Sequence, residues 1–221
     1  YNTPDRARAL SDYCLRAFYA SCIRAGADEA QGGQGWGGPK GGDVRIAAAS
    51  QHVLEQSAVR VSSDGAITAQ FTVCLPARGR TILGNGAAQI FRSSVPTMVQ
   101  SALFYQSHDP SHLKSHVLAI EDQAGLRRQL AHLQLVSFVA NGSILPRASG
   151  AADTPLASAS SVAFESPASL EVRLRLVNAG RDVAGMGLRK GVTLIVGGGY
   201  HGKSTLLNAI QSAVYDKIPG D

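Results

Sequence analysis

The stretch GGGYHGKST, residues Gly197–Thr205, has the spacing of a loop that binds phosphate. Gly197, four further residues and then Gly202-Lys203-Ser204 fit the Walker A pattern. In such a loop the glycines let backbone N–H groups point inward at an anion, and the start of the following helix adds positive charge. The lysine contacts the β- and γ-phosphates, and the serine hydroxyl binds Mg²⁺.

The pattern therefore predicts binding of ATP with Mg²⁺, with Lys203 as the catalytic residue and Ser204 as the metal ligand. We expect the nucleotide to be bound by Gly197, Gly198, Gly199, Tyr200, His201, Gly202, Lys203, Ser204 and Thr205. The alternative is a Gly-rich turn that fits the pattern by coincidence. The neighbouring sequence favours the loop.

A phosphate loop must stand between a strand and a helix. The apolar, β-branched run Val192–Val196 predicts a strand buried on both faces of a parallel sheet, and a helix is expected from Lys203 to about Val214. Upstream, SLEVRLRLVN alternates apolar and charged residues, which predicts a strand with one solvated face. The segment AGRDVAGMGLRKG between the two strands is interpreted as a turn.

The preceding residues alternate between helix and strand patterns. An amphipathic helix is expected from Asp5 to about Ala25, ending at Gly26, and a hairpin over residues 58–75. A loop is expected at residues 76–86, a helix from near Ala87, and two more helices at about 95–106 and 112–135. In the last of these, Leu126, Leu130 and Leu133 form the stripe that faces the core. VSFVANGSILP is interpreted as two strands around the Asn141-Gly142 turn.

The Gly-rich segment 31–43 cannot form a helix or strand without cost. It contains Trp36 and Lys40, so it either wraps a phosphate or stacks on a base, or it is a disordered linker.

Composition and charge limit the kinds of protein this chain can be. It has 221 residues, 44% of them hydrophobic, and a net charge of +5, which is typical of a globular protein and favours polyanionic partners. Three widely spaced cysteines argue against a disulfide framework or a zinc site and suggest a reducing, intracellular compartment. No apolar run approaches the roughly 20 residues of a membrane span. The sequence starts at Tyr1-Asn2 instead of Met, which is compatible with a leader that has been removed or left out.

Three other groups of residues are candidates for sites. His108, His112 and His116 have helical spacing, but Asp109-Pro110 places His108 outside the helix, so solvated or capping roles are favoured over a metal site. Glu121 and Asp122 are adjacent on a helix and cannot share a proton well, so surface roles or ion pairs with Arg127 or Arg128 are expected. A basic face suited to nucleic acid is predicted from Arg45, Arg60, Arg78, Arg80 and Arg92, against a role in solubility alone.

The motifs of residues 71–221 resemble those of the predicted ATPases of the ABC class. The resemblance rests on TVCLPARGRTILG, IEDQAGLRRQL, LVSFVANGSILPRASG and the run from GMGLRKG to the end. It implies an α/β fold, with an accessory α/β domain in residues 1–135 and the first half of an ABC-type P-loop ATPase domain in residues 136–221. It also implies an ATPase that closes as a homodimer around two nucleotides and acts on RNA. Within that family the chain also resembles a kinetoplastid mitochondrial ATPase associated with RNA editing, and this resemblance implies a mitochondrial location.

Two features depart from the pattern of ABC ATPases in general. Tyr200 and His201 stand where most such loops have small residues, although this family shares them. Tyr200 either contacts the nucleotide or a partner subunit, or packs against its own domain. No apolar strand ending in Asp-Glu follows Lys203, so the Walker B and signature motifs are expected beyond Asp221. The alternative function is a nucleotide-gated RNA-binding or scaffold protein with little or no hydrolysis; a transporter subunit is a third, less favoured one.

Overall fold

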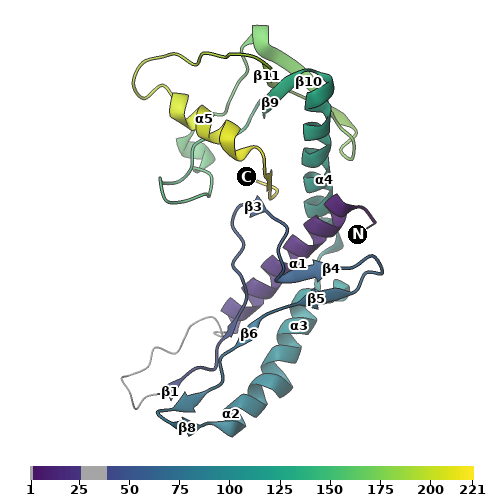
Figure 1. Ribbon diagram of the computed structural model, residues 1–221, viewed down its shortest axis with the longest axis vertical. Coiled ribbons are helices and arrows are strands. Elements are labelled where there is room, and N and C mark those ends of the chain that lie inside the picture. The colour runs from purple at the N-terminus through teal and green to yellow at the C-terminus, as the bar shows by residue number, and fades with distance from the viewer. Residues whose placement is uncertain (1, 26–38) are drawn as a thin grey trace. The chain divides into compact units, whose positions relative to one another are not determined.

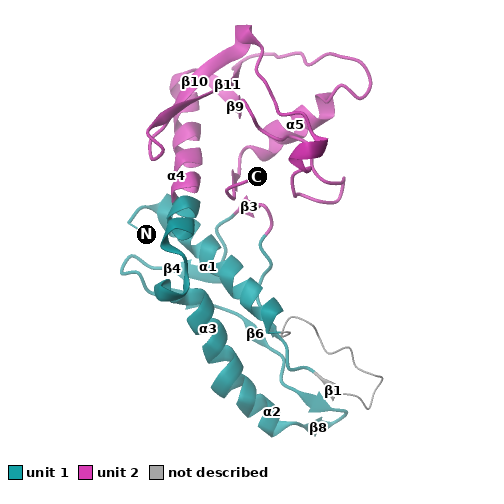
Figure 2. Ribbon diagram, turned by 180° about the vertical axis from the view of Figure 1, so that it is seen from behind, with its two compact units in different colours: residues 1–49, 54–117 teal, residues 50–53, 118–221 magenta. Residues whose placement is uncertain are grey.

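A computed structural model describes residues 2–25 and 39–221, which form two compact units (Figure 2). Unit 1 comprises residues 1–49 and 54–117, and unit 2 comprises residues 50–53 and 118–221. Residues 118–135, expected in the accessory domain, belong to unit 2, and the domain boundary itself stays a prediction. The predicted helix end at Gly26 and most of the Gly-rich segment 31–43, including Trp36, lie outside the described residues.

Unit 1 is built from helices packed on short antiparallel strands. Strand β7 (Ala77–Arg78) pairs on one side with β1 (Pro39–Lys40) and on the other with β8 (Thr81–Ile82). The other pairs are β2 (Val44–Arg45) with β6 (Thr72–Val73) and β4 (Val59–Val61) with β5 (Ile67–Ala69) (Figure 1). The β4–β5 pair confirms the predicted hairpin, although the following β6 pairs with β2 instead of β4. Gly41 is required where β1 meets residue 75, because a Cβ there would lie 2.4 Å from the Leu75 carbonyl oxygen.

The first helix, α1 (Pro4–Arg24), confirms the amphipathic pattern. Thr3 caps it by accepting a hydrogen bond from the Arg6 N–H at 3.3 Å. Its buried face presents Phe18 and Cys22 to a core that also contains Val44, Ile90, Met98 and Ala102. Cys14, on the same helix, packs with Leu15 and Val59, and burial raises the pKa of its thiol to about 11.

The helices predicted near Ala87 and at 95–106 form one continuous helical segment. It runs from α2 (Gly84–Gln89) through a π-helical turn (Ile90–Ser94) into α3 (Val95–Leu103). Pro96 has no N–H to donate to the preceding turn, which explains why the helix widens there. A single 3₁₀ turn (Tyr105–Ser107) then leads to α4 (Pro110–His132), and His108 lies before that helix, as expected.

Unit 2 has a three-stranded antiparallel sheet with a helix on it. The strands are β9 (Leu135–Ala140), β10 (Glu171–Leu176) and β11 (Arg181–Arg189), with β11 in the middle. Helix α5 (Lys203–Ser212) packs Leu206 and Ile210 against a core of Val139, Met186 and Leu188, and β12 (Asp216–Lys217) follows it and pairs with β3 (His52–Val53) (Figure 1). The outward charges of β10 confirm the predicted solvated face.

Two strand predictions in unit 2 are wrong. Residues 179–191, interpreted as a turn, contain β11, and their glycines mark close contact with β9: a Cβ on Gly185 would lie 2.3 Å from the Val139 carbonyl oxygen. Residues 192–196, expected as a buried strand, form no strand, and the side chains of Val192, Leu194 and Val196 are 104%, 82% and 74% exposed. A buried parallel strand needs neighbours on both edges, and among the described residues no strand pairs with this run.

Two smaller expectations also fail. The chain turns at Asn141-Gly142, with Gly142 at φ 87°, but β9 pairs with β11, and Gly142 donates its N–H to the Phe164 carbonyl instead of closing a two-strand hairpin. Leu133 is 49% exposed because α4 ends at His132, so only Leu126 and Leu130 of the predicted stripe are partly buried.

Candidate phosphate-binding loop

The loop Gly197–Gly202 leads directly into α5, which begins at Lys203 as predicted. Gly202 caps the helix in the left-handed region, at φ 77°, and Tyr200 also has a positive φ of 60°. A non-glycine residue adopts such a φ only where its surroundings hold it there. The backbone therefore has the alternating conformations from which anion-binding nests are made.

Two side chains of the loop bind the backbone of one residue, Gly198. The Gly198 N–H donates to His201 Nδ1 at 3.2 Å, and Lys203 Nζ donates to the Gly198 carbonyl oxygen. The lysine thus lies folded along its own loop. This contact keeps its charge beside the loop backbone, where a phosphate would bind.

The remaining loop side chains are open to solvent. Tyr200 is fully exposed, so it does not pack against unit 2, and Ser204 is exposed at the first turn of α5. The first turn of that helix contains no acidic residue. An anion at this helix end meets only favourable partial charge from the helix.

The far end of α5 is held by α4 through the strand that follows it. The Gln123 side chain forms two 2.8 Å hydrogen bonds with the Lys217 backbone, donating to its carbonyl and accepting from its N–H. Arg127 forms an ion pair with the buried carboxylate of Asp216. These contacts fix β12 and therefore the C-terminal end of α5.

Strand β12 is also paired with β3, a segment whose chain neighbours on both sides belong to unit 1. Lys217 Nζ lies 2.8 Å from His52 Nε2, and the Ile218 N–H donates to the Gln51 carbonyl at 3.1 Å. Burial, followed by the charge of Lys217, lowers the pKa of His52; burial also lowers the pKa of Lys217. The positively charged form of each of these two side chains is therefore less favoured here than it would be in an exposed side chain.

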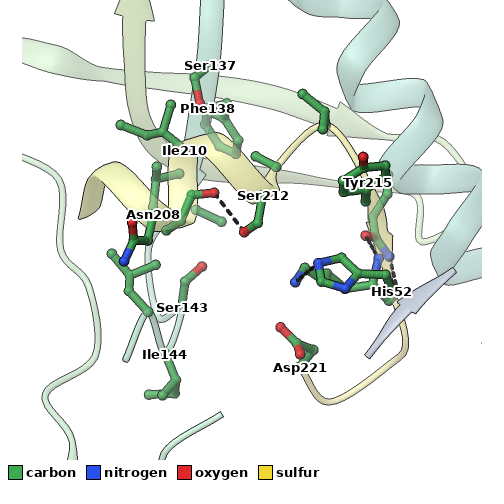
Figure 3. A pocket seen from close by; sticks show the side chains of 18 of the residues that line it. His52, Ser137, Phe138, Ser143, Ile144, Asn208, Ile210, Ser212, Tyr215 and Asp221 are labelled. Atoms are coloured by element: carbon green, nitrogen blue, oxygen red, sulfur yellow. Dashed lines mark hydrogen bonds between the residues drawn. The ribbon is translucent and has the colours of Figure 1, made fainter. Parts of the chain in front are cut away.

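A cavity of about 620 Å³ lies beside the β3–β12 pair in unit 2 (Figure 3). Four residues of α5 line this cavity: Asn208, Ala209, Ile210 and Ser212. It is also lined by His52 of β3 and by Tyr215 and Asp221, which lie before and after β12. None of residues 197–205 is among them. The cavity is therefore separate from the phosphate loop.

The other candidate residues lie in unit 1. Arg45, Arg60 and Arg78 are on β2, β4 and β7, while Arg80 and Arg92 follow β7 and α2; all five are exposed. Arg45 forms an ion pair with the buried Asp43, and the other four are on the surface with no carboxylate contact of that kind among the described residues.

The three histidines pack around Tyr13 instead of facing one another. Their ring centroids lie 5.2, 5.6 and 5.4 Å from that of Tyr13 for His108, His112 and His116. His116 Nε2 also lies 3.2 Å from Asp12 Oδ2. Within the described part of the chain, no group of three or more His, Cys, Asp or Glu side chains is arranged to hold a metal ion.

Comparison with known families explains this combination of a phosphate loop and a preceding unit. Residues 109–221 match the P-loop domain of the ABC-class ATPases, and residues 1–106 match the N-terminal domain of ATPases of the ABC class. The chain belongs to the ATPases of the ABC class. Its mixed α/β fold has the N-terminal domain of the family followed by the P-loop domain, and nucleotide binding is the chemistry of that domain.

A search of curated proteins found no match to the sequence. None of the helices in residues 2–25 and 39–221 is long and apolar enough to cross a membrane.

Several contacts around α5 could not be found from the sequence. Gln123, Arg127 and His52 are separated by about 90 to 165 residues from their partners Asp216 and Lys217. No local pattern marks a residue that hydrogen-bonds to a distant backbone. The contact between His201 and Gly198 is local, but the Walker A pattern leaves the residue at 201 undefined.

Proposed function

We propose that this ABC-class ATPase binds ATP with Mg²⁺ at Gly197–Thr205. The observation that carries the proposal is that the loop with Walker A spacing enters α5 at Lys203, with Lys203 Nζ held against the loop backbone. The loop amides and the helix N-terminus supply partial positive charge, and Lys203 supplies a full one. Ser204, at the first turn, offers the hydroxyl that a phosphate-bound Mg²⁺ requires.

The experiment is titration of a fluorescent ATP analogue against the full chain and its Lys203→Ala variant. Loss of a hydrogen bond from a charged donor costs about 1.5–3 kcal/mol, so affinity should fall by about 10- to 100-fold. Lys190→Ala is the matched control, because Lys190 is exposed and lies outside the loop. Unchanged affinity in Lys203→Ala would contradict the proposed site.

In the whole ATPase we propose that nucleotide drives closure of a homodimer, and that this closure acts on RNA bound by the accessory domain, residues 1–135. Residues 136–221 are then the beginning of the ATPase domain. The exposed arginines Arg60, Arg78 and Arg80, with Arg45, support this proposal, because guanidinium groups bind phosphate in two-point contacts. The resemblance to a mitochondrial RNA-editing ATPase supports the RNA ligand and a mitochondrial location.

The alternative is a nucleotide-gated RNA-binding or scaffold protein with little or no hydrolysis. Phosphate release by the whole ATPase under saturating ATP and Mg²⁺ distinguishes an active ATPase from a scaffold. Turnover that depends on Lys203 supports the ATPase, and ATP-dependent RNA affinity without turnover supports the scaffold.

A further inference from the structure

The backbone of Gly198 is bound on both sides by side chains of its own loop. Its N–H donates to His201 Nδ1 at 3.2 Å, and its carbonyl oxygen accepts from Lys203 Nζ. The lysine proposed to bind phosphate is therefore oriented by a residue that is itself held by His201.

The imidazole ring also packs against this part of the loop. A Cβ built on Gly198 would lie 3.0 Å from His201 Cε1, and one built on Gly197 would lie 3.7 Å from His201 Cβ. A contact of 3.0 Å is too short for carbon atoms, so an alanine at 198 would displace the ring. By contrast, a Cβ on Gly199 would meet nothing within 4 Å.

We infer that His201 is a positioning residue of the phosphate loop, which fixes Gly198 so that Gly198 can orient Lys203. This inference rests on the proposed nucleotide site. The role is distinct from contact with the nucleotide, because it uses Nδ1 and is directed at the protein's own backbone. A backbone N–H can only donate, so Nδ1 carries the lone pair and the proton of the neutral ring is on Nε2.

Three substitutions at His201 distinguish the role of Nδ1 from that of Nε2. The Oδ1 of asparagine can take the place of Nδ1, whereas glutamine extends its polar atoms to the position of Nε2. We expect His201→Asn to bind the fluorescent ATP analogue within about twofold of the wild-type affinity. His201→Ala and His201→Gln should bind it about three- to tenfold more weakly, the effect of one lost hydrogen bond.

Each other result overturns the inference. Retention by His201→Gln with loss in His201→Asn would assign His201 to direct phosphate contact through Nε2. An equal loss of affinity in all three variants would show that His201 acts only through the packing of its ring. Unchanged affinity in all three would show that His201 has no role at the loop.

A pair of glycine variants tests the same contact from the other side. Gly198→Ala should weaken nucleotide binding by a similar factor because it displaces the imidazole, while Gly199→Ala adds the same methyl group where space is open. If both variants bind alike, the ring does not position the loop.

A measurement without nucleotide keeps this inference separate from the proposed function. The ¹⁵N spectrum of the His201 ring in the free protein should show the tautomer protonated at Nε2, and the Gly198 amide resonance should shift in His201→Ala but not in His201→Asn. If the contact is seen and no variant, nor the wild type, binds ATP, the nucleotide site is wrong while the contact stands. If ATP binds and the ring is protonated at Nδ1, the positioning role is wrong.

Discussion

Asp122 shows how adjacent residues of the same type acquire different roles. It is buried and accepts hydrogen bonds from the backbone N–H groups of Asn178 and Ala179, at 2.8 and 3.2 Å, in the turn between β10 and β11. The neighbouring Glu121 accepts a hydrogen bond from the Asn178 side chain, at 3.0 Å. The surface role expected for Asp122 is therefore wrong.

Replacing Asp122 with alanine should lower the free energy of unfolding by about 1–3 kcal/mol, because two N–H groups of the turn lose their acceptor. Urea denaturation of the full chain, followed by a probe in unit 2, measures this change. Asp182→Ala is the control, since Asp182 and Arg175 form an exposed pair whose contribution should stay below about 1 kcal/mol. A destabilisation as small as the control's would show that the turn does not depend on Asp122.

At the scale of single residues, the sequence predicts where the Gly-rich loop ends and α5 begins, and little else around them; phosphate binding there stays a prediction. Walker A spacing is a local pattern, and the loop and the start of α5 appear where it places them. The acceptor role of Asp122 depends on a turn that is more than 50 residues away along the chain. Such a contact exists only after α4 and the sheet have packed together.

Among the elements, α4 acts as the support for two strands of unit 2. Its Gln129 side chain exchanges two hydrogen bonds with the Arg175 backbone of β10, at 2.9 and 3.0 Å, as Gln123 does with β12. A glutamine side chain has the same donor and acceptor as a peptide group, so each one satisfies an open strand edge. Helix α4 thus connects the hairpin β10–β11 with the segment that follows the phosphate-loop helix.

The β3–β12 pair should weaken as the pH falls below about 6.5, the pKa of a histidine in an unfolded chain. Burial and the charge of Lys217 lower the pKa of His52 in the folded protein, in spite of Asp153 and Asp221 nearby. When β3 is released from β12, His52 therefore takes up a proton at a pH where it stays neutral in the paired strand. This proton uptake favours release of the strand. Above about pH 7.5, His52 is neutral in both states and contributes no pH dependence.

Hydrogen-exchange protection of the Ile218 amide, which donates to the Gln51 carbonyl, measures the stability of the pair. Its protection factor should decrease between pH 7.5 and 5.5 in the wild type and stay constant in His52→Gln, which cannot be protonated in this range. Amides in the middle of β11 provide the internal control. The same decrease in His52→Gln would assign the effect to another group.

At the scale of the elements, the sequence pattern predicts whether a segment is a helix or a strand better than it predicts which strands pair. The helices α1, α4 and α5 and the hairpin β4–β5 follow from local periodicity and turn residues. The sequence does not predict β11 because Gly185 and Gly187, which allow the close approach of β9 and β10, resemble turn glycines. The run 192–196 was assigned as a strand because β-branched residues suit one, but a strand also needs a partner.

For the molecule as a whole, the net charge of +5 is consistent with a polyanionic ligand but does not locate it. The positive charge is partly neutralised within the fold: Arg16, Arg45 and Arg127 form ion pairs with the buried Asp12, Asp43 and Asp216. Arginines in such pairs contribute less to the binding of an external ligand, because a contact with the ligand would leave the buried carboxylate without its partner charge. The described surface therefore favours Arg60, Arg78 and Arg80 over Arg45 as phosphate contacts.

Binding of single-stranded RNA to the full chain tests this order. If Arg78 and Arg80 each contact a phosphate, Arg78→Ala with Arg80→Ala should reduce the slope of log K against log salt concentration by about 1.4, or about 0.7 for each lost contact. Arg45→Ala should change the slope little, and Arg173→Ala, an exposed position on β10 of unit 2, is the matched control. A slope that is the same in all four proteins would show that the arginines of unit 1 serve solubility, since binding through phosphate must release counterions in proportion to the contacts made.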